Sequence, residues 1–161
     1  MTLDKDTLNT LTDLMKISAT KGNLPTAAVL LNENNEIVSK SQSLVKTYSD
    51  PTAHADVLCI RKYAVETDAP FTTENLTLVA VFEPSLMALA AASWFGIRRA
   101  TYILPAHKFW DTVKWTTEGK ALDKQDVIKN FDNKIELLHL TQYEDDFTEL
   151  FNTTLPKTLR A

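Results

Sequence analysis

The chain has 161 residues, of which 44% are hydrophobic and 24% are charged, with a formal net charge of −4 and a single cysteine. This length and composition predict one globular domain over residues 1–161, long enough to bury a hydrophobic core. The negative net charge argues against a nucleic-acid partner. Because Cys59 is the only cysteine, the chain cannot form an intramolecular disulfide or a cysteine-based zinc cluster.

The first part of the chain alternates between helical and strand patterns. Apolar residues at helical spacing predict a helix over 4–21, followed by a buried strand at Pro25–Leu31 and its hairpin partner at Glu36–Leu44. We expect no signal peptide at this amphipathic start, and no apolar run approaches the roughly 18 residues of a membrane helix. The sequence therefore predicts a cytoplasmic protein that makes no membrane contact.

The middle of the chain predicts a crossover between two strands. A helix is expected from Asp50 to about Glu66, and a second buried strand from Leu76 to Phe82. Pro84 is suited to the first position of the next helix, which Gly96 closes. A strand over 97–104 follows, and because a helix joins these two strands we expect them to be parallel.

The last third completes a layered domain. A helix is predicted over 123–131, a strand over 134–140 and a closing helix over 143–155. The resulting order predicts a three-layer α/β/α domain around a mixed five-stranded sheet whose last two strands are parallel. Between these elements, Trp110 and Trp115 either wall a pocket or belong to the core.

Two short segments carry the chemistry. Residues 50–61 read DPTAHADVLCIR, and residues 83–88 read EPSLMA. Together they resemble the H-x-E and P-C-x-x-C signature of the zinc nucleobase deaminases. The chain resembles the cytidine deaminase-like superfamily over roughly residues 4–155, and more narrowly its guanine deaminase and tRNA adenosine deaminase branch. The run PTAAVLLNENNEIVSKS looks like the first hairpin of that fold.

The resemblance implies a zinc site, but this chain departs from it at most positions. In the family one histidine and two cysteines hold zinc, and a glutamate moves protons between the bound water and the base. The corresponding residues here are His54, Ser85 and Ala88 for the ligands and Asp56 for the glutamate. One imidazole does not hold the metal, so we expect no bound metal. Asp56 is shorter by about 1.5 Å, and a misplacement of about 1 Å can cost about a hundredfold in rate.

The same resemblance suggests which residues line the former site. Ser43 stands where the family has a base-contacting asparagine, and Glu83 matches a family glutamate. We expect Ser43, His54 and Glu83 to line a vestigial pocket for a small purine-like or pyrimidine-like ligand. Three alternatives stay open: His54 as a hydrogen-bonded helix-start residue, Asp56 as a stabiliser of the helix N-terminus, and His54, Asp56 and Glu83 as a replacement metal site. Cys59 is expected to pack in the core.

Our first hypothesis is a deaminase-like pseudoenzyme that has lost zinc-dependent hydrolysis and serves as a scaffold for binding or assembly. The resemblance implies a homodimer. The alternative is an active deaminase of guanine, cytosine or adenosine type with zinc in a non-standard site, or with Asp56 and His54 as acid–base groups. A third hypothesis is a partner subunit that stabilises an active deaminase paralogue in a heterodimer.

Overall fold

The computed structural model describes residues 1–113 and 122–161, and a five-stranded sheet in the order β2-β1-β3-β4-β5 is its centre. Strand β1 is antiparallel to β2 and β3, whereas β3 and β4, and β4 and β5, run parallel. This arrangement confirms the predicted mixed sheet with its last two strands parallel. The strands are β1 (Ala27–Leu31), β2 (Ile37–Gln42), β3 (Thr77–Phe82), β4 (Arg99–Leu104) and β5 (Glu136–His139).

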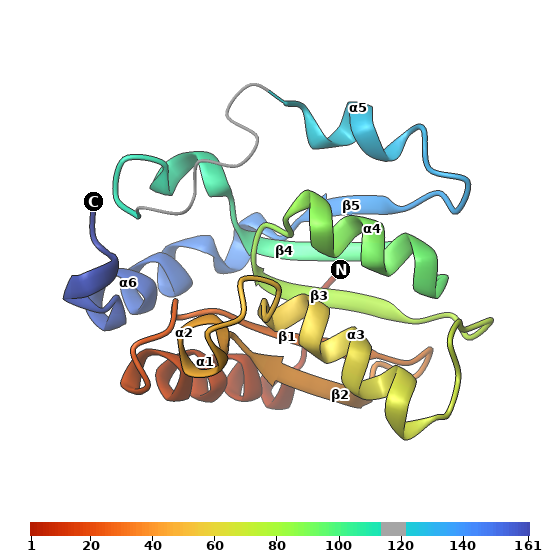
Figure 1. Ribbon diagram of the computed structural model, residues 1–161, viewed down its shortest axis with the longest axis horizontal. Coiled ribbons are helices and arrows are strands. Elements are labelled where there is room, and N and C mark those ends of the chain that lie inside the picture. Colours follow the sequence, from red (N-terminus) through yellow and green to blue (C-terminus); the bar gives the residue numbers. More distant parts are fainter. Residues whose placement is uncertain (114–121) are drawn as a thin grey trace.

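Helices cover both faces of this sheet, which confirms the three-layer expectation (Figure 1). In the described ranges no helix is both long and apolar enough to cross a membrane. The α-helices are α1 (Lys5–Thr20), α2 (Val45–Tyr48), α3 (Ala55–Glu66), α4 (Leu86–Phe95), α5 (Lys124–Ile128) and α6 (Glu144–Thr154), and the 3-10 turns are η1 (Ala106–Phe109), η2 (Thr141–Tyr143) and η3 (Lys157–Leu159).

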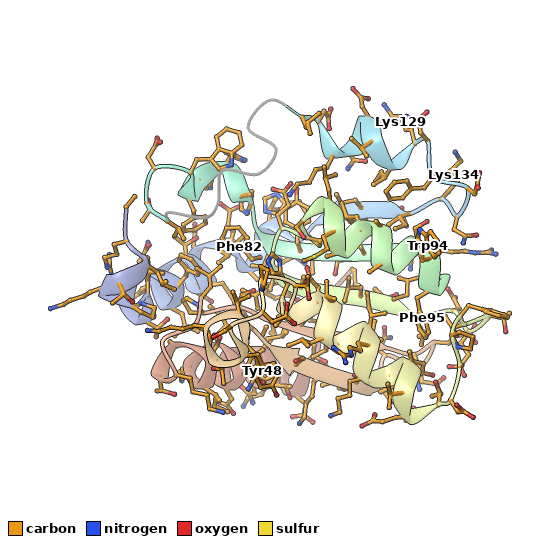
Figure 2. All side chains as sticks on the ribbon, viewed as in Figure 1. Tyr48, Phe82, Trp94, Phe95, Lys129 and Lys134 are labelled. Atoms are coloured by element: carbon orange, nitrogen blue, oxygen red, sulfur yellow. The ribbon has the colours of Figure 1, made fainter. Side chains whose placement is uncertain are left out.

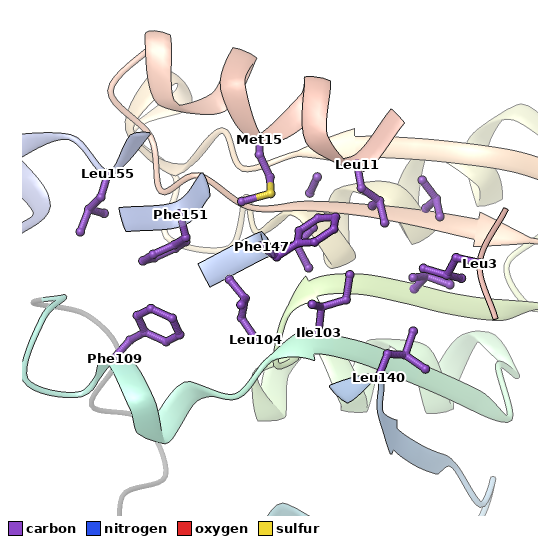
Figure 3. Close-up of a cluster of buried hydrophobic side chains, with 14 of the residues drawn as sticks. Leu3, Leu11, Met15, Ile103, Leu104, Phe109, Leu140, Phe147, Phe151 and Leu155 are labelled. Atoms are coloured by element: carbon purple, nitrogen blue, oxygen red, sulfur yellow. The ribbon is translucent and has the colours of Figure 1, made fainter. Parts of the chain in front are cut away.

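One hydrophobic core lies between the sheet and helices α1 and α6 (Figure 3). Alternate side chains of the strands point to this face, because successive side chains of a strand lie on opposite sides of the sheet. Val29, Val79 and Ile103 come from the sheet, and Leu11 and Phe151 come from the helices. The periodic apolar face predicted for the first helix is therefore the face that packs here.

A second core lies between the opposite sheet face and helices α3 and α4. Its sheet side chains are the other alternate set, including Ala28, Leu30 and Leu78. Ala88 and Ala92 of α4 are fully buried, and their small side chains allow α4 to pack close to its neighbours. Strand β1 is buried on both faces, as its continuous apolar sequence indicates.

Two predicted helix starts are wrong, and local hydrogen bonds give the reason. The helix expected from Asp50 begins at Ala55, because the Asp50 carboxylate accepts from the backbone N and the hydroxyl of Thr52 at 2.8 and 2.7 Å and closes a turn instead. Helix α2, which precedes this turn, was not predicted. Pro84 was expected at the first helical position, but Ser85 caps the helix through its hydroxyl.

The first core generates a prediction for stability. Phe151 is fully buried against Phe82 and Phe109, so Phe151→Ala should lower the free energy of unfolding by about 3–5 kcal/mol. Phe71 is 64% exposed, so Phe71→Ala is the control, with a change within about 0.5 kcal/mol. Urea unfolding followed by circular dichroism measures both. Equal effects of the two substitutions would contradict this account of the core.

Candidate functional site

A cavity of about 490 Å³ lies where the two signature segments meet. It opens between the start of α3, the start of β1, the end of β3 and the start of α4. Its described lining is mainly apolar, with polar side chains from several elements. The lining residues are Asn23, Leu24, Thr26, Ala27, Ser43, Val45, Lys46, Ser49, Asp50, Pro51, His54, Ala55, Asp56, Ala80, Phe82, Glu83, Ser85, Ala106 and Lys124.

The start of α3 brings His54 and Asp56 to this cavity. His54 is the N-cap residue in extended conformation, and its backbone carbonyl accepts from Leu58 N at 2.9 Å, but its ring makes no capping hydrogen bond. His54 is therefore a helix-start residue, as one of the expected alternatives had it, and it is hydrogen-bonded there through its backbone and not through its ring. Asp56 lies in the first turn, and its carboxylate accepts from the backbone N of Val57 at 2.9 Å.

The Asp56 carboxyl is the most deeply buried acidic group of the cavity, at 6% exposure. Burial raises its pKa above the ordinary aspartate value, and the nearby His54 and, more weakly, Lys124 oppose this shift. The cause is that a carboxylate loses its hydration in an apolar enclosure. Asp56 therefore holds its proton to a higher pH than an exposed aspartate does, as a candidate acid–base group would.

The start of α4 places Ser85 in the cavity wall, at the position of the first family cysteine. Its hydroxyl accepts from the backbone N of Ala88 at 3.2 Å and so caps the helix. Ala88, at the second cysteine position, is fully buried and has no donor atom. Within the described ranges, no cluster of three or more His, Cys, Asp or Glu side chains is arranged to hold a metal. The donor set does not fit zinc, and the replacement site suggested for His54, Asp56 and Glu83 does not form among these residues.

Glu83 ties the end of β3 to two other segments. Its carboxylate accepts from the backbone N of Ala106 at 2.8 Å and lies 3.1 Å from the Lys124 ammonium. Lys124 also donates to the Pro84 carbonyl at 2.9 Å. Glu83 is thus a structural hydrogen-bonding group near a helix start, and it also neutralises a buried lysine.

The structure brings the predicted residues Ser43, His54, Asp56, Glu83 and Ser85 to one cavity. The described lining does not include Ala88, whose side chain is fully buried. Cys59 is buried on the same helix as His54, and burial raises its pKa to about 12, as expected for a packing residue.

Sequence analysis missed Lys124, which belongs to this cavity. It lies in a short polar helix whose sequence gives no sign of burial, forty positions from its partner Pro84. Trp115, expected either in a pocket wall or in the core, lies outside the described residues. Trp110 is partly exposed and is not among the described residues of the cavity wall.

Comparison of the sequence with known proteins finds similarity to deaminases. A guanine deaminase of Bacillus subtilis is 36% identical over 125 residues, which cover 78% of this chain and 74% of that protein. A tRNA-specific adenosine deaminase of Haemophilus influenzae is 31% identical over 81 residues, which cover 50% of this chain and 46% of that protein. The chain spans less than half the length of three of the curated relatives that it matches.

The solved structures agree at the level of the fold. A guanine deaminase from Nitrosomonas europaea superposes with a TM-score of 0.78 over 96% of this chain and 86% of that chain, at 15% identity. The family model of the cytidine and deoxycytidylate deaminase zinc-binding region matches residues 1–104. Those residues include both signature segments and the strands and helices that position them, and the chain therefore belongs to the cytidine and deoxycytidylate deaminase family.

Proposed function

We propose that this chain is a deaminase-family pseudoenzyme, which has lost zinc-dependent hydrolysis and keeps its pocket to bind a small nucleobase-like ring. The observation that carries the proposal is that Ser85 and Ala88 stand where the family has its two zinc-binding cysteines. The Ser85 hydroxyl is engaged as a helix cap, and Ala88 offers no donor atom. Zinc sites of catalytic type use three protein ligands, and His54 would be left as the only one.

The retained pocket supports a binding role. A cavity of about 490 Å³ lies within the size range of small-molecule sites. Its wall is mainly apolar with a few convergent polar groups, which suits a flat heterocycle. The relatives act on guanine and on adenosine in tRNA, as their names say, so we infer a ligand with a similar ring. We propose that the protein is cytoplasmic and binds this ligand there.

Assembly is the second part of the proposal. Met87, Ala90, Ala91 and Trp94 follow one another at helical spacing on α4. In this single chain Trp94 is 86% exposed (Figure 2), and the family resemblance implies a homodimer. We propose that a second copy of the chain covers this stripe, because a large exposed apolar side chain beside small residues is typical of an interface.

Zinc content tests the proposed loss of activity. Protein expressed with zinc and purified without chelator should contain far less than one zinc per chain and release no ammonia from guanine, cytosine or adenosine. The matched control is the double variant Ser85→Cys with Ala88→Cys, which restores both thiolate donors and should retain more zinc. Near-stoichiometric zinc in the unmodified chain, with ammonia release that His54→Ala abolishes, would establish the active alternative instead.

The buried Asp56 carboxyl gives a pH-dependent prediction. Its pKa is raised in the folded state, so its stability contribution is full below the unfolded-state pKa of about 3.9 and is lost as the pH rises through the raised value. Asp56→Asn stays neutral, and it should therefore raise the free energy of unfolding near neutral pH by about 1 kcal/mol or more.

Urea unfolding at several pH values measures this effect. The gain of Asp56→Asn over the unmodified chain should shrink as the pH falls towards about 4. Asp50 is the control, because hydrogen bonds from Thr52 lower its pKa, so Asp50→Asn should give no gain near neutral pH. A pH-independent effect of Asp56→Asn would show that its carboxyl is not held in the neutral form.

The α4 stripe predicts the oligomeric state. Sedimentation velocity should find a dimer for the unmodified chain and a monomer for Trp94→Glu, since a charge in the interface would remain desolvated. Ile17→Glu on α1 is the control, because Ile17 is partly exposed on the opposite side of the sheet, and it should stay dimeric. A monomer that dimerises only with a deaminase paralogue would favour the partner-subunit hypothesis.

A further inference from the structure

A lysine is buried in the wall of the pocket. Lys124 is only 8% exposed, and its ammonium donates to the Pro84 carbonyl at 2.9 Å and pairs with the Glu83 carboxylate at 3.1 Å. A buried ammonium is costly unless it is paired and hydrogen-bonded, and these contacts meet that requirement. The ammonium is therefore enclosed almost entirely by protein groups.

The position of this ammonium matters for the pocket. Pro84 immediately precedes Ser85, the residue at the first cysteine position, and the charge of Lys124 also acts on Asp56. The chain thus places a fixed positive charge beside the positions where the family pattern has its metal ligands. This charge comes from α5, which approaches the start of α4 from a distant part of the sequence.

The hydrogen-bonding capacity of Lys124 defines what it can contact. An ammonium has three N–H donors and no acceptor. Among the described residues, the contacts with Pro84 and Glu83 account for two of these donors. No described residue accepts from the third donor, and Lys124 lines the cavity, so a molecule inside the cavity can accept from it. A carbonyl oxygen would accept this hydrogen bond, whereas an amino group would present a second donor to it.

We propose that Lys124 selects the ligand of this pocket, and that the site prefers rings with a carbonyl oxygen over the matched rings with an amino group. This inference rests on the proposed function and names its ligand class, the oxo-purines and oxo-pyrimidines. An amino substituent facing the buried ammonium would lose its hydration without gaining a partner. Sites that leave a buried polar group unpaired reject the mismatched ligand strongly.

The other lysine of the cavity does not have the same effect. Lys46 also lines the pocket, but its side chain is exposed at the surface. Water and salt screen an exposed charge much more than a buried one. The selectivity is therefore assigned to Lys124 alone.

Isothermal titration calorimetry with two matched pairs tests the inference: hypoxanthine against adenine, and uracil against cytosine. The full chain should bind the oxo member of at least one pair about tenfold or more tightly than the amino member, as expected for one charge-assisted hydrogen bond. Lys124→Met should reduce that ratio to within about twofold. Lys40→Met, an exposed lysine on β2 outside the cavity, should leave the ratio unchanged.

Several results would overturn the inference. One is that adenine and cytosine bind as tightly as hypoxanthine and uracil. Another is that the Lys124→Met variant still prefers the oxo compounds. The third is that none of the four compounds gives a heat of binding at millimolar concentration. Thermal unfolding checks that the variant is folded. If it is not, Lys124→Gln keeps a donor at the site, and the comparison of ligands on the unmodified chain decides by itself.

The failure of the proposed function gives a different result. Zinc-dependent ammonia release from adenine or cytosine by the unmodified chain would contradict the loss of hydrolysis. It would not by itself change the ratio of affinities, which is measured on the zinc-free protein after dialysis against chelator. The two conclusions are therefore tested separately.

Discussion

The Glu83 carboxylate is the group on which the shape of the pocket depends. It accepts from the backbone N of Ala106 and neutralises Lys124, so one side chain at the end of β3 joins the segment after β4 to helix α5. Lys124 in turn holds the Pro84 carbonyl at the start of α4. Removing any member of this network would leave a buried charge or polar group unpaired, which costs several kcal/mol in typical cases.

This network also changes the electrostatics of the site relative to the family pattern. That pattern has a divalent cation held by thiolates and an imidazole. Here a single ammonium stands beside the same helix start, and its charge is balanced by Glu83. Asp56 also lines this cavity, and burial raises the pKa of its carboxyl. The cavity wall therefore combines a lysine that is paired with Glu83 and a carboxyl that burial favours in its neutral form. Such a site suits recognition of a polar ring edge.

Much of the fold could be predicted because its strands have strong patterns. The continuous apolar run before Leu31 indicated a strand buried on both faces, and the helix that joins β3 and β4 required them to be parallel. The starts of α3 and α4 were harder to place, because side-chain caps and turns compete with the helix at these points. Thr52 closes a turn onto Asp50, and Ser85 caps α4 one residue after Pro84.

The sequence by itself determined the three-layer fold class, the parallel pairing of the last two strands, the family resemblance and the residues missing from the zinc signature, because hydrophobic period and residue identity are local properties. It also indicated that Ser43, His54, Asp56 and Glu83 share a site. Only the tertiary structure decided that Lys124 joins them, because its contact with Pro84 spans forty positions and depends on how α5 packs. The raised pKa of the Asp56 carboxyl was likewise decided there, because burial follows from packing and not from residue type.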